Sequence, residues 1–141
     1  VGDGDDRARL QALHPEAEFT GWRDRAGVEA AALGTRLVVM PSKLPEPFGL
    51  VAVEAARSGL PVLLAREALL APELERLGAG AAIDVRDAGA LARRLAGLAT
   101  DDLAVETMSR AGFERGAGLA TTPEEWLDRF LDLYRRRLQE A

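Results

Sequence analysis

Two glutamates, Glu46 and Glu54, stand with seven residues between them at a predicted transition from loop to helix. An ionised carboxylate only accepts hydrogen bonds, so this pair suits a ligand that carries neighbouring hydroxyl groups. Between them, Phe48, Gly49 and Leu50 lie where a helix presents its first unpaired N–H groups. Gly49 has no Cβ, which leaves room for a ligand close to the backbone. These residues predict a site for a ligand with both hydroxyl and anionic groups.

The segment that must position this site reads as a buried strand, a proline-stiffened loop and a helix. Residues 38–40 form a short apolar run that is typical of a covered parallel strand, and prolines 41, 45 and 47 follow it. From Phe48 the pattern is helical, with Leu50, Val53 and Ala56 on the predicted inner face. Gly59 is expected to end the helix in a left-handed conformation. A helix N-terminus at the carboxyl end of a buried strand is a ready anion site.

The rest of the chain alternates between strand and helix patterns, which predicts an α/β fold. We expect a Rossmann-like, three-layer α/β/α domain with a mostly parallel sheet, as one domain over residues 1–141. The chain begins at the end of a first strand, and further strands are expected over 17–20, 36–40, 61–65 and 81–84. Helices are expected over about 6–13, 25–33, 48–58, 72–77, 88–98, 101–113 and 123–140.

The helix patterns also predict caps and core positions. Asp24, Asp87 and Thr122 are predicted N-caps, and Glu125 completes a capping box with Thr122. The predicted inward residues of the other helices are Leu10, Leu13, Leu91, Leu95, Leu98, Leu103, Met108 and Phe113. The final helix carries an apolar stripe of Trp126, Phe130, Leu133 and Tyr134.

Composition excludes several classes of function. The chain has no cysteine and one histidine, His14, which rules out thiolate catalysis and makes a histidine-built metal site improbable. A formal charge of −5 and the lack of a basic face argue against nucleic-acid binding. No long apolar run predicts a transmembrane segment, and no secretory signal is evident, so a cytoplasmic location is expected.

The run from Glu46 to Glu54, EPFGLVAVE, resembles the signature of family-4 retaining glycosyltransferases of GT-B architecture, in which seven residues separate two glutamates. The flanking Pro41-Ser42 and the segment SGLPV over 58–62 are similar to that family's "PS" and "GxPV" segments, and residues 1–4 to its "VGDG". The resemblance implies the donor-binding C-terminal half of a GT-B protein, truncated at its N-terminal edge. It further implies a missing N-terminal domain that would hold the acceptor, and a fragment that is inactive alone.

The resemblance implies a role for each matching residue. Glu54 would hold the ribose of a nucleoside-diphosphate sugar, most simply a UDP-sugar, and Glu46 would hold hydroxyls of the donor sugar. The amides of Phe48, Gly49 and Leu50 would face sugar or phosphate oxygens. Gly2, Trp22 and Arg23 would lie beside the nucleotide, although the sequence leaves open whether Trp22 and Arg23 are plain surface residues. No residue is assigned as catalytic, and no cofactor or metal is expected.

One segment departs from the family pattern. Where the family has two glycines followed by an acidic residue, this chain has Arg66-Glu67-Ala68-Leu69-Leu70-Ala71-Pro72-Glu73, which adds side chains near the sugar-phosphate pocket. The sequence therefore leaves a second function open, a non-catalytic binding or assembly module on the same fold. A nucleotide-sugar epimerase of related architecture is a more distant alternative. A dinucleotide oxidoreductase is poorly supported, because no G-x-G-x-x-G follows a strand.

Overall fold

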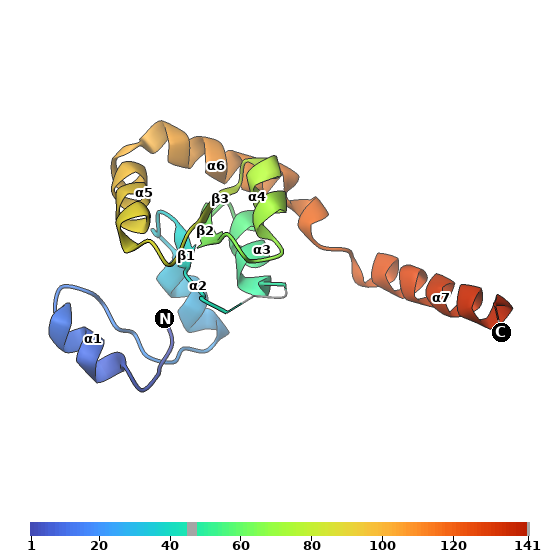
Figure 1. Ribbon diagram of the computed structural model, residues 1–141, viewed down its shortest axis with the longest axis horizontal. Helices are drawn as coiled ribbons and strands as arrows, with labels where there is room; N and C mark the ends of the chain where they lie inside the picture. The colour runs from blue at the N-terminus through green and yellow to red at the C-terminus, as the bar shows by residue number, and fades with distance from the viewer. Residues whose placement is uncertain (45–47, 141) are drawn as a thin grey trace. The chain divides into compact units, whose positions relative to one another are not determined.

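A computed structural model describes residues 1–44 and 48–140 (Figure 1). The chain divides into two compact units, residues 1–35 and residues 36–141. The first unit contains two short helices, α1 (Arg7–Leu13) and α2 (Arg25–Ala32). The second contains, in order, β1 (Val38–Met40), α3 (Leu50–Arg57), β2 (Val62–Ala65), α4 (Ala71–Leu77), β3 (Gly80–Ile83), α5 (Ala88–Thr100), α6 (Asp102–Arg115), the 3₁₀ helix η1 (Gly116–Leu119) and α7 (Pro123–Gln139).

The second unit confirms the predicted α/β, Rossmann-like fold. Its three strands form a parallel sheet in the order β1-β2-β3. Val38 pairs with Val62, and Val62 pairs in turn with Gly80. Each pair of neighbouring strands is joined through a helix, because parallel neighbours need a crossover connection. All three strands therefore end at one edge of the sheet, where Met40, Ala65 and Ile83 are their last residues.

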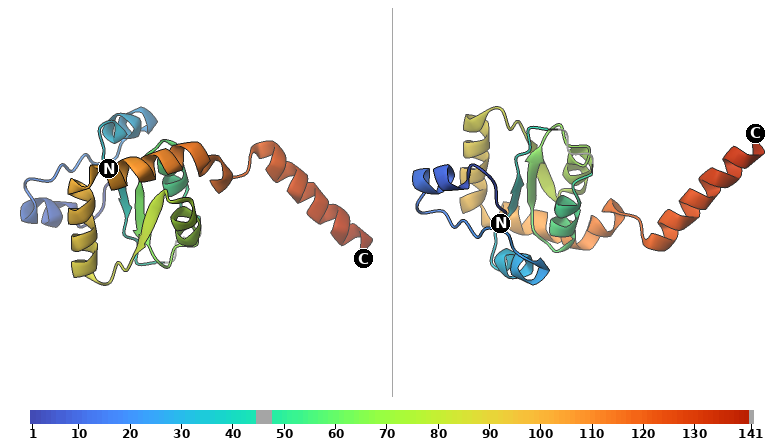
Figure 2. Two further views of the ribbon diagram at one scale, coloured as in Figure 1. Left: turned by 90° about the horizontal axis from the view of Figure 1, so that it is seen from above. Right: turned by 90° about the horizontal axis from the view of Figure 1, so that it is seen from below.

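Side chains alternate across the strands and build a core on each face of the sheet. Val62 and Leu64 belong to a cluster that also contains α3, α4 and η1 residues. Leu63 and Ala65 point the other way and pack with Leu98 of α5 and the partly buried Val105 and Met108 of α6. Two views in Figure 2 show the resulting layers, with α3 and α4 on one side of the strands and α5 on the other.

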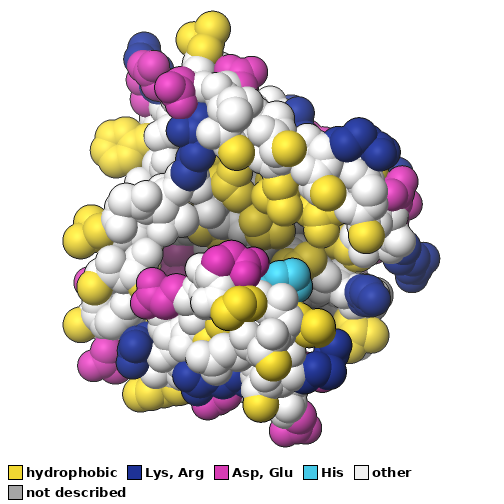
Figure 3. Space-filling view, turned by 90° about the vertical axis from the view of Figure 1, so that its left-hand side faces the viewer, with side chains coloured by type: hydrophobic (Ala, Val, Ile, Leu, Met, Phe, Trp, Pro, Cys, Tyr) yellow, Lys and Arg dark blue, Asp and Glu magenta, His cyan; other side chains and the backbone are white. Residues whose placement is uncertain are grey.

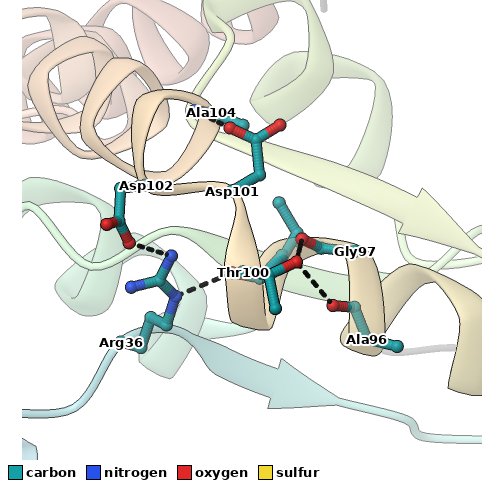
Figure 4. A network of polar contacts seen from close by, with 8 residues as sticks. Arg36, Ala96, Gly97, Thr100, Asp101, Asp102 and Ala104 are labelled. Atoms are coloured by element: carbon teal, nitrogen blue, oxygen red, sulfur yellow. Dashed lines mark hydrogen bonds and ion pairs between the residues drawn. The ribbon is translucent and has the colours of Figure 1, made fainter.

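Arg36 connects the start of this unit to the junction of α5 and α6. Its Nε donates to the Leu98 carbonyl at 2.7 Å, and its Nη2 donates to Asp102 Oδ1 at 2.6 Å (Figure 4). Asp101 caps α6 by accepting from the Ala104 N–H at 2.9 Å. Because a planar guanidinium can serve two acceptors at once, one side chain fixes the end of α5 and the beginning of α6.

The predicted caps and helix ends are largely confirmed. Asp24 accepts from the Gly27 N–H at 2.9 Å, and Asp87 from the Ala90 N–H at 2.8 Å. Thr122 and Glu125 form the predicted reciprocal capping box at the start of α7. Gly59 is left-handed, with φ of 79°.

The structure corrects several predictions in the first unit. Residues 17–20 form no strand; the segment around them makes one isolated antiparallel bridge, between Gly2 and Gly21. A strand needs a hydrogen-bonded neighbour along its length, and a single bridge supplies one contact. Leu10 and Leu13 were predicted to be buried, but both are exposed. Helix α1 has seven residues and no buried residue, so its apolar side chains have no core to enter.

Further corrections concern α3 and α6. The helix α3 begins at Leu50 rather than Phe48, because Gly49 is its N-cap with a left-handed backbone. Leu50 is exposed, and the buried face consists of Ala52, Val53, Ala55 and Ala56. In α6, Met108 packs on the core as predicted, whereas Leu103 and Phe113 are exposed, because Ala111 and Gly112 make the close contact instead.

Within residues 1–44 and 48–140, no helix combines the length and the apolar character needed to cross a bilayer.

Candidate functional site

The carboxyl edge of the sheet carries a small pocket on the side of α3. It is lined by the ends of β1 and β2, the loop after each strand and the start of α3: Met40, Ser42, Phe48, Gly49, Leu64, Ala65, Ala68 and Leu70. Ligands of open parallel sheets bind outside the carboxyl ends of the strands, so this is the edge at which the fold favours a site.

Gly49 sets the geometry of the helix start. It is buried and left-handed, with φ of 71° and ψ of 56°, a conformation that glycine adopts without a steric penalty. Its carbonyl accepts from the N–H groups of Ala52 and Val53 at 2.8 and 3.3 Å. Gly49 provides no side-chain cap, so the first N–H groups of α3 are left for solvent or for an anionic ligand.

Glu54 lies one turn further along α3. The residues on both sides of it, Val53 and Ala55, are buried against the core, whereas Glu54 is exposed. Among the residues that the structure describes, its carboxylate has no hydrogen-bond or ion-pair partner. The carboxylate is therefore held on a packed helix and keeps its full capacity to accept hydrogen bonds from a ligand.

The predicted site residues fall into two groups. Phe48, Gly49, Leu50 and Glu54 are brought together at the start of α3, and Phe48 and Gly49 line the pocket. Glu46 lies outside the described residues. Gly2, Trp22 and Arg23 belong to the other unit, where the Gly2 N–H donates to the Gly21 carbonyl at 2.8 Å and so lies beside the Trp22 segment.

Trp22 has the exposure that a stacking platform would need. Its side chain is 75% exposed, and Arg23 is exposed as well. Both residues therefore present free surface, which fits contact with a nucleotide base as well as a plain surface position.

Three residues of the pocket wall were not assigned to the site from the sequence, although Ser42 and the segment around Ala68 were compared with the family pattern. Ser42, Ala68 and Leu70 line it, and Ala68 and Leu70 come from the segment in which the family's two glycines are replaced. Their position in the sequence could have indicated a place at the site, because each of these residues follows closely after the end of a predicted buried strand. The wall is mainly apolar, with the Ser42 hydroxyl as its one side-chain hydrogen-bonding group among the described lining residues.

His14 is not among the described residues that line the pocket. The only histidine of the chain is exposed (cyan in Figure 3), and its Nδ1 lies 3.3 Å from Glu16 Oε1. The pKa of Glu16 lies below its ordinary value, first because of a backbone hydrogen bond at Glu16 itself and then because of His14.

Comparison of the sequence with known proteins identifies the family of this chain. A segment of 64 residues, 45% of this chain, is 50% identical to a GDP-mannose-dependent alpha-mannosyltransferase of Mycobacterium tuberculosis (strain CDC 1551 / Oshkosh). That segment spans 16% of the length of the relative. No solved structure matches the chain significantly. The family model described as "Glycosyl transferases group 1" matches residues 1–115, and the chain belongs to this family of glycosyltransferases.

Proposed function

We propose that this chain binds the nucleoside-diphosphate sugar donor of a retaining glycosyl transfer. The observation that carries the proposal is the family match over residues 1–115, which includes both the pocket and Glu54. The geometry supports it, because one helix start provides free N–H groups, a glycine that lets a ligand approach the backbone, and a carboxylate without a partner among the described residues.

Each group has a distinct task in this proposal. The Glu54 carboxylate accepts hydrogen bonds from the two ribose hydroxyls. The N–H groups at the start of α3, near Phe48 and Gly49, face the sugar and the diphosphate, and they stabilise the negative charge that develops as the diphosphate leaves. Glu46 holds hydroxyls of the donor sugar, and Gly2, Trp22 and Arg23 border the base. None of these roles requires a metal.

The choice of donor follows from the relative. That relative is GDP-mannose-dependent, which makes GDP-mannose the first donor to test, and a UDP-sugar remains the prediction made from the sequence. The domain that would hold the acceptor, and the inactivity of this chain in isolation, also remain predictions.

Calorimetric titration tests donor binding directly. We expect the chain to bind one of GDP, UDP and ADP with a Kd on the order of 0.1–1 mM. Glu54→Gln removes the charge but keeps the shape, and should weaken binding at least about tenfold, since hydrogen bonds to charged groups contribute roughly 1.5–3 kcal/mol. Glu114→Gln, at an exposed position of α6, is the matched control and should leave the Kd unchanged.

The stereochemistry is tested separately, in a longer protein that contains this chain and an acceptor-binding domain, because the chain alone is predicted to be inactive. In its transfer reaction with the preferred donor, proton NMR of the first product should show the donor's anomeric configuration. An inverted product would reject the retaining mechanism while leaving donor binding intact.

A second candidate function is favoured by one observation. Ala68 and Leu70 are buried, and their side chains form part of the pocket wall within the segment that replaces the family's glycine pair. This arrangement fits a non-catalytic module whose donor pocket is partly filled. If none of the three nucleotides binds, and if Ala68→Gly combined with Leu69→Gly restores binding, the second function is the better description.

A further inference from the structure

The connection between β2 and α4 (Figure 1) begins with a tight turn that borders the pocket. The Ala68 N–H donates to the Ala65 carbonyl at 3.0 Å, which closes a β-turn with Arg66 and Glu67 at its two central positions. The end residues of the turn, Ala65 and Ala68, are buried and line the pocket, whereas the two central residues are exposed. The turn therefore presents two charged side chains beside a mainly apolar wall.

Hydrogen bonds fix the backbone of this turn at both ends. The Arg66 N–H donates to the Ile83 carbonyl at 2.9 Å, next to the register pair of Ala65 and Ile83 that ends the pairing of β2 with β3. At the other end, the Ala71 N–H donates to the Ala68 carbonyl at 3.0 Å, and α4 begins at Ala71. Because the backbone at Arg66 and Glu67 is held in this way, a ligand that binds there does not have to order it.

Neither charged side chain has a partner among the described residues. Within residues 1–44 and 48–140, Arg66 and Glu67 form no side-chain hydrogen bond or ion pair, either with each other or with another residue. Glu73 and Arg76, a few residues further along the chain, are by contrast joined by two hydrogen bonds. The Arg66 guanidinium therefore keeps its donors, and the Glu67 carboxylate keeps its acceptor sites, for a ligand.

The pocket wall itself offers little to a sugar. Ser42 has the one side-chain hydrogen-bonding group among the described lining residues. A hexose carries several hydroxyl groups, and each hydroxyl both donates and accepts hydrogen bonds. A hydroxyl that leaves water without finding a partner weakens binding, so a sugar site needs donors and acceptors at its border. Arg66 supplies donors only and Glu67 supplies acceptors only, so together they can serve both functions of neighbouring hydroxyls.

We propose that Arg66 and Glu67 bind hydroxyl groups of the donor sugar and select a neutral hexose. This inference rests on the proposed function, because it requires a nucleoside-diphosphate sugar at the pocket. The charges of the two side chains are opposite, so a sugar acid would be attracted by Arg66 and repelled by Glu67. A neutral sugar meets no such repulsion.

Titration with a free nucleotide and with its sugar conjugate separates this inference from the proposed function. The Kd of GDP reports the nucleotide part of the site, and the ratio of the Kd values of GDP and GDP-mannose reports the sugar part. We expect the chain to bind GDP-mannose at least about threefold more tightly than GDP, as one net hydrogen bond allows. If the chain binds UDP instead, UDP and UDP-glucose replace this pair of ligands.

Substitutions assign the preference to the turn. Arg66→Met and Glu67→Met keep an unbranched side chain but remove its charge, and each should raise the Kd of GDP-mannose at least about threefold while leaving the Kd of GDP unchanged. Arg94→Met on α5 and Glu114→Met on α6 are the matched controls, because both residues are exposed and neither lines the pocket. These control variants should bind both ligands as the original chain does.

Two further measurements check for a merely structural role. In amide proton–nitrogen NMR spectra, the signals of residues 66–68 should move on adding GDP-mannose and stay in place on adding GDP. Urea denaturation should give both turn variants the midpoint of the original chain, since the two side chains are exposed and have no partner among the described residues. A lower midpoint with an unchanged preference for the sugar would assign the turn a structural role and overturn the inference.

The outcomes distinguish the two proposals. If the chain binds GDP and GDP-mannose equally, the inference fails and nucleotide binding stands. An equal loss of GDP and GDP-mannose binding in Arg66→Met would assign this side chain to the diphosphate instead. Tighter binding of GDP-mannuronate than of GDP-mannose would overturn the selection of a neutral sugar. If none of the nucleotides binds, the proposed function fails and this inference fails with it.

Discussion

At the scale of single residues, the Glu73–Arg76 pair has a predictable acid–base behaviour. The Arg76 Nε lies 3.1 Å from Glu73 Oε2, and its Nη2 contacts Glu73 Oε1. Because the carboxylate accepts these hydrogen bonds and lies beside a positive charge, the pKa of Glu73 is below its ordinary value of 4.5. Arg76→Gln should raise that pKa toward the ordinary value. Carboxyl-carbon NMR titration measures it, and Arg110→Gln, which removes the partner of Glu106, should not change the pKa of Glu73.

The sign of the linked stability follows from the direction of the shift. A carboxyl whose folded pKa is lowered contributes stability at pH values above its unfolded pKa, and that contribution is lost as the pH falls through the folded value. The pair should therefore stabilise the fold at neutral pH and contribute nothing at pH values below both pKa values. A pair that stabilised the fold equally at pH 2 and pH 7 would contradict this account.

Gly49 offers a second prediction at this scale. Its left-handed backbone has φ of 71°, which an L-residue adopts at a cost of roughly 1–2 kcal/mol. Gly49→Ala should lower the free energy of unfolding by about that amount in urea titration. Gly118→Ala is the control, because Gly118 has no positive φ and a Cβ there would meet nothing within 4 Å. Equal stability of the two variants would mean that the Gly49 conformation is not required.

At the scale of elements, replacing two helical glycines with alanine should change the free energy of unfolding in opposite directions. A Cβ at Gly112 of α6 would lie 2.5 Å from the Ala56 carbonyl oxygen of α3, so Gly112→Ala must push the two helices apart. We expect a loss of about 1–3 kcal/mol from overpacking. At Gly97 of α5 a Cβ would meet nothing within 4 Å, so Gly97→Ala should stabilise the helix by about 0.5–1 kcal/mol. Chemical denaturation of both variants measures the difference in sign.

Elements were predictable from the sequence where a local signal decides them. Asp24, Asp87 and Thr122 cap the predicted helices because their side-chain oxygens satisfy N–H groups two or three residues on. The burial of individual side chains was less predictable, because it depends on which residues of neighbouring elements pack against them. Phe113 has the size of a core residue but is 69% exposed, since the close approach of α6 to α3 is made by Gly112.

At the scale of the whole molecule, the α/β fold was predictable because three strands alternate with helices of clear periodicity. The site was predictable in part, from the resemblance of the Glu46–Glu54 run and from the rule that ligands bind at the carboxyl edge. The remainder depends on how the chain folds. Ser42 lies close to Ala68 and Leu70 because the loops after β1 and β2 meet at that edge, and no spacing in the sequence shows this.

The last prediction concerns α7 and the stability of the entire chain. The core ends with Leu119 and the partly buried Ala120, so no residue of α7 contributes to it. A chain truncated after Thr121 should therefore keep the Tm of the complete chain to within about 2 °C at micromolar concentration, since a loss of 1 kcal/mol would lower the Tm of a chain approaching 150 residues by roughly 2–4 °C. Scanning calorimetry of both chains measures the difference. A truncated chain that melts more than about 5 °C lower when dilute would instead show that α7 packs on its own core.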